Sequence, residues 1–373
     1  MLPPPSFLFV TCQVGAEPAV KDELARRWPQ FRFAYSRPGF LTFKLPEGHG
    51  LADDFDLESV FARAYGFSLG KVSGATEDEI APAAWKLAGT APAEKLHVWP
   101  RDVRPAGEHG FSPGLSLAAL SARAALLRAA PATAKMALGD VTAVARAGQL
   151  VLDCVLVQAN EWWIGYHRAR PGPSCLPGGL DDLTLPEAAV SRAWLKMEEA
   201  LRWSRLPMSA GEHCVEIGCA PGGSCQSLLA RGLIVAGVDP ADVHPDVLAH
   251  ANFTHVRMRG ADIRRREFRQ IDWLMADMNV APTYTLDAVE AIVTHAAVHI
   301  RGLLLTLKLS DWRMAADVPE FLARVRSWRY PHVIARQLQH CRQELCVAAW
   351  RDAPKRAGAK PGRTARGRIR DRH

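Results

Sequence analysis

Residues 216–223 read EIGCAPGG and join an apolar run to a helix-like run, QSLLARGL. Two adjacent glycines, Gly222 and Gly223, therefore follow a proline at the end of an expected strand. In the dinucleotide-binding turn G-x-G-x-x-G, the second glycine lets the backbone approach a pyrophosphate. Here Ala220 replaces that glycine and Pro221 follows it, which argues against NAD and FAD as ligands of this turn.

The sequence around this turn alternates between strand-like and helix-like segments from residue 187 to residue 351. Such alternation predicts an α/β fold, an open and mostly parallel sheet with helices on both faces. The last two expected strands, residues 332–339 and 344–350, have no helix between them, so the last one is expected to run antiparallel at or near the sheet edge. That ending is typical of class I, Rossmann-like methyltransferases rather than of dehydrogenases.

The N-terminal half predicts α+β structure of another kind. Residues 1–75 fit a ferredoxin-like α+β segment. Residues 76–170 form a second segment, and a Pro- and Gly-rich linker follows it at residues 171–186. Ser116 is the expected N-cap of an amphipathic helix, and residues 57–67 are expected to contain a helix and then a strand. The other expected elements here are strands at 6–12, 31–35, 40–45 and 95–100, helices at 17–28 and 76–89, and a hairpin around residues 159–160.

The net charge of +7 comes from the C-terminal end of the chain. Residues 351–373 hold nine Lys/Arg and two Asp/Glu, which gives +7, so residues 1–350 sum to zero. Because they carry almost no apolar side chain, residues 352–373 are expected to form a basic, disordered tail. The tail is either a solubilising segment or an electrostatic arm for nucleic-acid phosphate, and its many cations favour the second interpretation.

Composition and cysteine spacing indicate a globular protein of the cytoplasm. Hydrophobic residues make up 48% of the 373, yet no apolar run approaches the roughly 20 residues that cross a bilayer, so no membrane association is expected. The eight cysteines form no C-x-x-C pair and no Cys/His cluster at zinc spacing. Neither a disulfide framework nor a metal site is expected, and the N-terminus is a poor signal peptide.

Four charged side chains occur near the ends of expected strands, in the order Lys, Asp, Lys, Glu. Lys308 lies in the segment LLLTLKL, at the end of a very apolar expected strand. An unpaired ammonium would be costly there, so Lys308 must be paired or face a cleft. Asp277 closes one strand, Glu344 opens another, and Lys196 lies in the helix before the first strand. Each has an ordinary alternative: Lys196 as a solvated helix residue, Asp277 as a cap, Glu344 as a surface charge. The ordered set is more specific than any single member.

A further carboxylate, Asp239, ends the strand that follows the glycine turn. A carboxylate in that place can accept two hydrogen bonds from ribose hydroxyls. The alternative is that APGG is only a tight turn and Asp239 only a helix cap. A binding role is favoured, because both features fall at the carboxyl ends of adjacent strands, where open α/β sheets bind their ligands.

Together these features resemble the FtsJ-like RNA 2′-O-methyltransferases, which carry a Lys-Asp-Lys-Glu set on a Rossmann-like sheet. The resemblance is strongest from residue 187 to about residue 350. Within that family it is closest to members in which a ferredoxin-like segment and a THUMP RNA-binding domain precede the catalytic domain. Ser224 and Ser310 depart from the family pattern, since they stand where Trp and Pro are usual. The matching stretches are SRAWLKMEEA, the G-x-x-P-G-G turn, RGADIRRREF, WLMADM, LKL and RQLQHCRQELCV.

The resemblance implies a cofactor and a substrate. It implies transfer of a methyl group from S-adenosylmethionine (SAM) to the ribose of a cytidine in large-subunit (23S) ribosomal RNA, before subunit assembly. Residues 187–351 would be the methyltransferase domain, residues 76–170 the THUMP-like RNA-binding domain, and the chain a monomer. Asp239 would bind the cofactor ribose, and Asp262 would lie near the adenine. The implied cofactor-binding residues are Gly218, Ala220, Pro221, Gly222, Gly223, Asp239, Asp262 and Asp277.

The implied catalytic residues are Lys196, Asp277, Lys308 and Glu344. Lys308 is expected to act as general base, because a second cation and partial burial both favour its neutral form. Asp277 and Glu344 oppose that shift and would orient the two lysines. An equally physical variant keeps Lys308 protonated and uses it only to orient the hydroxyl. This chemistry requires no metal.

Other functions remain compatible with the sequence. One is the same chemistry on another RNA, either transfer RNA or a different ribosomal site. Another is a non-catalytic RNA-binding protein of ribosome assembly that keeps the fold. A nicotinamide oxidoreductase is disfavoured by the missing middle glycine and by the paired final strands.

Overall fold

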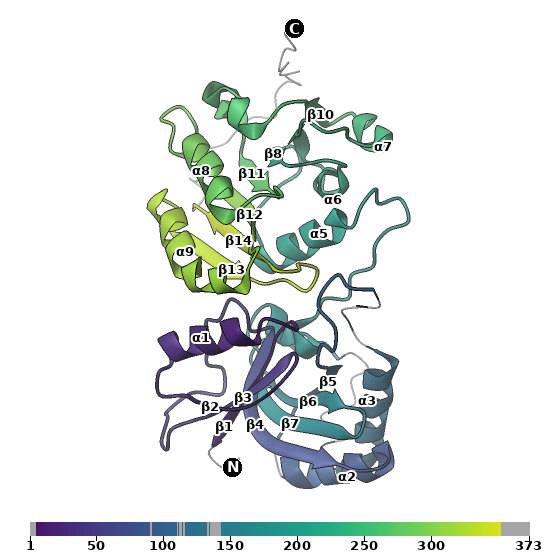
Figure 1. Cartoon of the computed structure of the whole chain (residues 1–373). Helices are drawn as coiled ribbons and strands as arrows, with labels where there is room; N and C mark the ends of the chain where they lie inside the picture. Colours follow the sequence, from purple (N-terminus) through teal and green to yellow (C-terminus); the bar gives the residue numbers. More distant parts are fainter. Residues whose placement is uncertain are drawn as a thin grey trace. The chain divides into compact units, whose positions relative to one another are not determined.

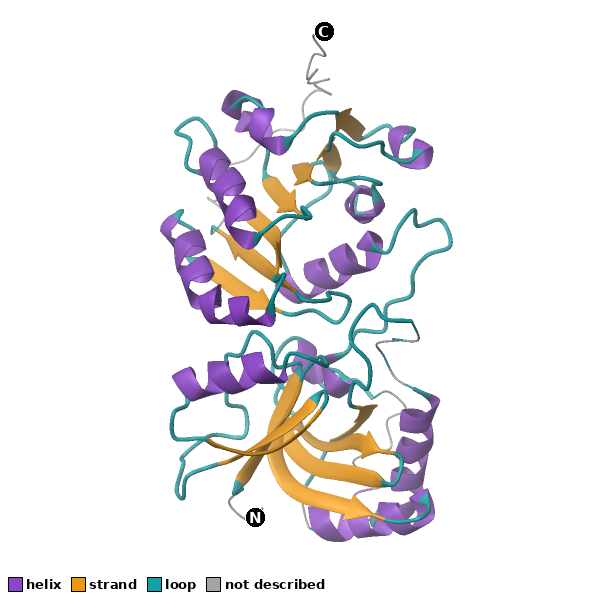
Figure 2. Ribbon diagram, viewed as in Figure 1, coloured by secondary structure: helices purple, strands orange, loops and turns teal. Residues whose placement is uncertain are grey.

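The computed structural model describes residues 5–89, 92–109, 111, 114, 116–132, 134 and 143–351. The chain divides into two compact units, each with its own sheet (Figures 1 and 2). Unit 1 comprises Met1–Thr184, Ser310–Ala316 and Arg336–Gln343, and unit 2 comprises Leu185–Leu309, Asp317–Ala335 and Glu344–His373. The basic tail expected at residues 352–373 lies outside the described residues.

Unit 1 is built on a single seven-stranded sheet with the order β2-β3-β1-β4-β7-β6-β5. Pairing is antiparallel throughout except between β5 and β6, which are parallel. The ferredoxin-like segment and the THUMP-like segment expected from sequence therefore share one sheet, joined where β4 pairs with β7. The strands are β1 (Phe7–Thr11), β2 (Arg32–Arg37), β3 (Phe40–Lys44), β4 (Ala64–Ser73), β5 (Lys95–Pro100), β6 (Leu150–Gln158) and β7 (Glu161–Arg168).

The helices of unit 1 begin where the sequence places their caps. α2 (Glu77–Ala88) and α3 (Leu117–Ala129) start after Thr76 and Ser116, whose hydroxyls accept hydrogen bonds from backbone N–H groups three residues on, so the N-cap predicted at Ser116 is confirmed. The two helices pack on one face of the sheet, and Trp85 Nε1 of α2 donates to the Leu126 carbonyl of α3 at 2.8 Å (Figure 1). α1 (Glu17–Arg27) is a further α-helix of this unit.

The helix expected within residues 57–67 is absent from the structure, and only the strand β4 follows. Other acceptors take the backbone N–H groups that a helix would use. Ala62 N donates to the Ser59 hydroxyl at 2.9 Å, and Arg63 N donates to the Thr11 carbonyl at 2.7 Å. Because these acceptors compete with the i−4 carbonyls, the segment stays irregular despite its helix-like pattern.

Unit 2 has the order β10-β9-β8-β11-β12-β14-β13. The pairs from β10 to β12 are parallel, and β14 pairs antiparallel with β12. The antiparallel last strand predicted from sequence is confirmed. This strand, β14, lies between β12 and the edge strand β13. The strands are β8 (His213–Ile217), β9 (Ile234–Val238), β10 (Phe253–Val256), β11 (Trp273–Ala276), β12 (Gly302–Lys308), β13 (His332–Arg336) and β14 (Glu344–Trp350).

Helices connect the strands of unit 2 in the manner of a doubly wound sheet (Figure 2). The apolar strand β12 shows why the sheet is central, since Leu303, Leu305 and Leu307 are fully buried. No helix in the described ranges is both long and apolar enough to cross a bilayer. The α-helices are α5 (Ala193–Ser204), α6 (Gly223–Ala230), α7 (Pro245–Leu248), α8 (Pro282–Val293) and α9 (Val318–Ser327).

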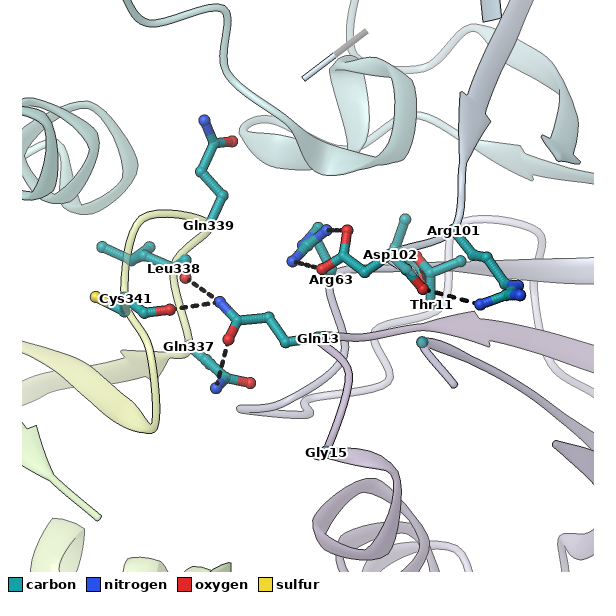
Figure 3. A network of polar contacts seen from close by, with 12 residues as sticks. Thr11, Gln13, Gly15, Arg63, Arg101, Asp102, Gln337, Leu338, Gln339 and Cys341 are labelled. Carbon is teal, nitrogen blue, oxygen red and sulfur yellow. Dashed lines mark hydrogen bonds and ion pairs between the residues drawn. The ribbon is translucent and has the colours of Figure 1, made fainter. Parts of the chain in front are cut away.

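The segment between β13 and β14 belongs to unit 1, where a buried amide holds it. Gln13 Nε2 donates to the carbonyl oxygens of Leu338 at 2.8 Å and of Cys341 at 2.6 Å, as Figure 3 shows. Gln337 Nε2 donates in turn to Gln13 Oε1 at 3.1 Å (Figure 3). The carbonyls of this irregular segment thus have donors although they are buried. The segment ends at Gln343, directly before β14.

Candidate functional site

The carboxyl ends of the parallel strands of unit 2 bring the predicted charged residues to one edge of the sheet. Asp277 follows the last residue of β11, and its N–H donates to the Ile217 carbonyl at the end of β8. Lys308 is the last residue of β12 and is the register partner of Glu344, the first residue of β14. Because β14 runs antiparallel, its beginning lies where the parallel strands end, and the topology alone places these side chains together.

The four charged side chains form one ion-pair cluster. Lys308 Nζ lies 2.8 Å from Asp277 Oδ1 and 2.6 Å from Glu344 Oε2. Lys196, from α5, forms an ion pair with Glu344 and lies 3.8 Å from Asp277 Oδ2. Glu344 is buried, whereas the other three side chains are 22–26% exposed. The cluster is thus open to solvent on one side, as a site for an external hydroxyl group requires.

The carboxylates decide the charge of Lys308. Burial by itself lowers the pKa of this amine, but Asp277 and Glu344 outweigh burial and raise it above its ordinary value. Burial likewise raises the pKa of Glu344, and the two lysines more than reverse that effect. The expectation that Lys196 and burial move Lys308 towards neutrality is therefore wrong for the ligand-free chain, because two carboxylates contact the amine directly.

The glycine turn needs its glycines for reasons that the structure shows. Gly218 has φ +86°, and a Cβ there would lie 2.5 Å from the Asp277 carbonyl oxygen. Gly222 has φ +114°, a conformation that side chains disfavour. At Gly223, the first residue of α6, a Cβ would lie 2.2 Å from Ser191 Oγ. The turn therefore brings the start of α6 and the ends of two strands closer together than any side chain would allow.

Asp239 lies beside this turn, as the sequence predicted. Its Oδ2 accepts a hydrogen bond from Ala220 N at 3.1 Å, and its Oδ1 accepts one from Ala241 N at 2.8 Å. Each carboxylate oxygen keeps a second lone pair for another donor. The side chain is half-buried, so a ligand that donates two hydroxyl groups would find both oxygens held in place by the backbone.

Asp262 differs from the other predicted site residues. It is exposed on the 3-10 turn Gly260–Asp262, which follows β10. Its backbone N–H donates to the Arg259 carbonyl at 3.0 Å. Within the described part of the chain, its side chain makes no hydrogen bond or ion pair with the cluster or the turn. Its assignment to a cofactor therefore stays a prediction.

Sequence reasoning gave no role to Glu216, which is fully buried in the middle of the sheet. Ser224 Oγ and Cys225 Sγ, both in the first turn of α6, donate hydrogen bonds to its carboxylate. Burial raises the pKa of Glu216 to about 7, although these two donors act against the rise. Ser224, which departs from the family pattern, thus has a defined contact in this chain as a donor to a buried carboxylate.

Unit 1 holds three side chains of metal-ligating types that the sequence did not group. His97, Asp153 and His167 offer ligand atoms that all lie within 4.8 Å of one another. No metal site was expected, because the sequence shows no ligand cluster at zinc spacing. The three residues come from three neighbouring strands, and only strand pairing brings them together.

A comparison with protein families defines the class. Residues 189–317 match the model of the FtsJ-like methyltransferase family. This range contains the glycine turn, Lys196, Asp277 and Lys308, and it coincides with the greater part of the unit 2 sheet. Residues 189–317 of the chain are therefore similar to an FtsJ-like methyltransferase domain, which confirms the resemblance predicted from sequence for this part of the chain.

Curated relatives narrow the class further. Ribosomal RNA large subunit methyltransferase M of Alkalilimnicola ehrlichii is 35% identical over 191 residues, which is 48% of this chain and 50% of that protein. The protein of the same name from Shewanella amazonensis is 24% identical over 367 residues, 92% of this chain and 97% of its own. Where the identity is 30–35%, the chain spans about half the length of the curated relatives that it matches.

Solved structures add only a general likeness. A Burkholderia thailandensis structure of 1,6-didemethyltoxoflavin-N1-methyltransferase aligns with 45% of this chain and 80% of its own. The identity is 15% and the TM-score 0.33. Nothing in the functional assignment rests on this similarity.

Proposed function

We propose that the chain is a SAM-dependent RNA methyltransferase that modifies the ribose 2′-oxygen of a cytidine in large-subunit ribosomal RNA. The observation that supports this most is the pairing of Lys308 with Asp277 and Glu344 at the carboxyl edge of an FtsJ-like sheet. The relatives' names point to ribosomal RNA of the large subunit as the substrate class. The proposal includes a cytoplasmic location for the chain.

The residues around the glycine turn fit SAM. The cofactor carries no phosphate, so a turn without the middle glycine of the dinucleotide fingerprint suits it. Asp239 offers two held carboxylate oxygens for ribose hydroxyls, and Asp277 supplies negative charge beside the turn. SAM supplies an electrophilic methyl group on a sulfonium. Asp262 is proposed to serve the adenine end.

The ion-pair cluster positions the attacking hydroxyl. Because the pKa of Lys308 is raised, Lys308 carries a proton at neutral pH in the ligand-free chain. We therefore assign it the orienting role, in which its ammonium holds the 2′-oxygen in line. The hydroxyl proton becomes strongly acidic as the new C–O bond forms, so a carboxylate of the cluster suffices to accept it. Lys196 helps to fix Glu344, and Asp277 fixes Lys308.

Unit 1 is proposed to bind the RNA, with residues 76–170 as a THUMP-like domain. The support is the relation to ribosomal RNA methyltransferases that extends over both halves of the chain. We further propose that the substrate is RNA before subunit assembly and that the chain works as a monomer.

Transfer of a labelled methyl group to ribosomal RNA that lacks the modification tests the proposal. We expect transfer by the unaltered chain and at least a roughly 100-fold loss in Lys308→Ala, because the 2′-oxygen is no longer held in position. Arg326→Ala is the matched control, since it removes an exposed cation from α9 of the same unit. Near-normal transfer by Lys308→Ala, or transfer only to other RNA classes, would contradict the proposal.

A further inference from the structure

Three strands of unit 1 present a histidine, an aspartate and a histidine on one face of the sheet. His97 on β5 and Asp153 on β6 are register partners, and His167 on β7 lies two residues along from Gly165, the partner of Asp153. This face is opposite to the one that α2 and α3 cover, because the alternate residues Leu96, Val98, Leu152 and Cys154 pack there. The ligand atoms of the three residues all lie within 4.8 Å of one another.

Two of these side chains are buried without the partners that buried polar atoms need. His97 and Asp153 are both 0% exposed. Neither ring nitrogen of His97, nor Asp153 Oδ1, has a hydrogen-bond partner in the described part of the chain, although His97 Nδ1 lies 4.0 Å from that oxygen. The backbone of Ala143 interacts with the His97 ring but completes no hydrogen bond of normal geometry. Orphaned buried polar atoms of this kind call for a water or an ion.

The third side chain is already oriented as a metal ligand. His167 Nε2 lies 2.9 Å from the Ser174 carbonyl oxygen, which can only accept, so this nitrogen carries a proton. His167 Nδ1 then faces Asp153 Oδ2 at 2.6 Å. Either a proton or a metal ion must lie between these two acceptors. A histidine that donates one N–H to a backbone carbonyl and points its other nitrogen at a carboxylate has the outer contacts typical of metal ligands.

The cluster borders an open space on one side. On the other side it is closely packed, since a Cβ at Gly66 would lie 3.2 Å from Asp153 Oδ2 and 3.0 Å from a Phe9 ring carbon. The rings of His97 and His167 also line a cavity of about 390 Å³. A fourth coordination position is therefore reachable by water from this cavity.

Most positive groups near the cluster have acidic partners. Three of the four arginines in the cavity wall each form an ion pair with an aspartate: Arg63 with Asp102, Arg168 with Asp53, and Arg170 with Asp56. The fourth, Arg336, donates to the Arg63 carbonyl. Lys95 and Arg123, which lie near His97, also have polar partners. The carboxylate of Asp153 is thus the charge that a bound cation would meet first.

We propose that His97, Asp153 and His167 bind one Zn²⁺ ion, with water from the cavity as fourth ligand. Two imidazole nitrogens and a carboxylate oxygen are a ligand set that zinc accepts with tetrahedral geometry and one open position. Ligand atoms around tetrahedral zinc lie about 3.3 Å apart. The contact between His167 Nδ1 and Asp153 Oδ2 must therefore lengthen by under about 1 Å. The other pairs of ligand atoms, which lie within 4.8 Å of one another, must close to the same spacing.

Zinc binding to the full, tag-free chain tests this inference. After chelator treatment, the chain is titrated with Zn²⁺ against a chromophoric competitor, and metal content is measured after gel filtration. We expect one equivalent per chain in the unaltered protein, and affinity lower by about 100-fold or more in His97→Ala and in Asp153→Asn. His109→Ala is the matched control, because His109 is an exposed histidine of the same unit, and it should bind zinc normally.

A second measurement uses only the unaltered chain, so it tests the proposal even if the variants fail to fold. Co²⁺ in the unaltered chain should give the visible bands of a four-coordinate ion with nitrogen and oxygen ligands. No uptake of one equivalent by the unaltered chain, a thiolate charge-transfer band, or equal binding by His97→Ala and His109→Ala would each overturn the proposal. Methyl transfer is not the readout, so this result is independent of the proposed function.

Discussion

Lys308 illustrates how two carboxylates at contact distance override burial. Its amine touches Asp277 and Glu344 at 2.8 and 2.6 Å, so the charged form is favoured although the side chain is only one-quarter exposed. The sequence predicted that these residues would meet, since each stands at a strand end of a doubly wound sheet. It offered no means to weigh two ion pairs against burial, because that balance depends on distances of a few ångströms.

The raised pKa of Lys308 leads to a prediction about pH. If Lys308 acts as an ammonium that orients the hydroxyl, kcat for methyl transfer should stay nearly constant between about pH 7 and 9, because the amine remains protonated throughout. Single-turnover rates at saturating SAM and RNA measure this directly. A rise of about tenfold per pH unit across that range would instead show that the scarce neutral amine is the active form.

Glu216 predicts a pH dependence of stability. Its folded pKa of about 7 lies above its ordinary value of 4.5, so folding favours the protonated form. The stability that this group contributes is complete below about pH 4.5 and is lost as pH rises through 7. In Glu216→Gln that loss disappears, so the free energy of unfolding of the variant relative to the unaltered chain should rise by as much as about 3 kcal/mol from about pH 4.5 to about pH 8.

Urea unfolding at several pH values measures this difference, with Glu267→Gln as the control because Glu267 is exposed on the turn Arg265–Gln270. The same pH profile in both variants would show that Glu216 is not the group responsible.

At the scale of elements, apolar patterning and caps predicted most of the structure. The hydroxyl cap before α3 and the apolar runs of β8, β11 and β12 lie where the sequence places them. The predictions failed where other acceptors replace the i−4 carbonyls of an expected helix, as Ser59 Oγ and the Thr11 carbonyl do before β4. They also missed the zinc candidate, because its three residues are far apart in sequence and meet only through the pairing of β5, β6 and β7.

The segment 336–343 supports a prediction at this scale. Gln13→Ala removes the donor that serves the carbonyls of Leu338 and Cys341. Two buried acceptors without a donor should lower the free energy of unfolding by about 1–3 kcal/mol. Chemical denaturation measures the loss, and Gln30→Ala, at an exposed position, provides the control. Equal stabilities of the two variants would show that the Gln13 hydrogen bonds contribute nothing.

At the scale of the whole molecule, the positive charge of the chain is concentrated at its C-terminal end, where it could bind RNA phosphates of any sequence. Residues 352–373 hold eight Lys/Arg and two Asp, a net charge of +6, whereas residues 1–350 sum to zero. Deletion of this tail should weaken RNA binding and flatten its salt dependence, by about 0.7 in log–log slope for each phosphate that the tail would otherwise neutralise. Filter binding at several salt concentrations tests this, and an unchanged slope would assign the tail another role.

The central claim is that the Lys308 cluster directs a methyl group to a ribose 2′-oxygen of large-subunit RNA. Alkaline hydrolysis of the methylated RNA followed by mass spectrometry tests it most directly, because a methylated 2′-oxygen cannot attack the adjacent phosphate. We predict one linkage that resists alkali, at a cytidine of the large-subunit RNA, which is absent when Lys308→Ala replaces the unaltered chain. A label that appears on a base and leaves every linkage alkali-sensitive would contradict the claim.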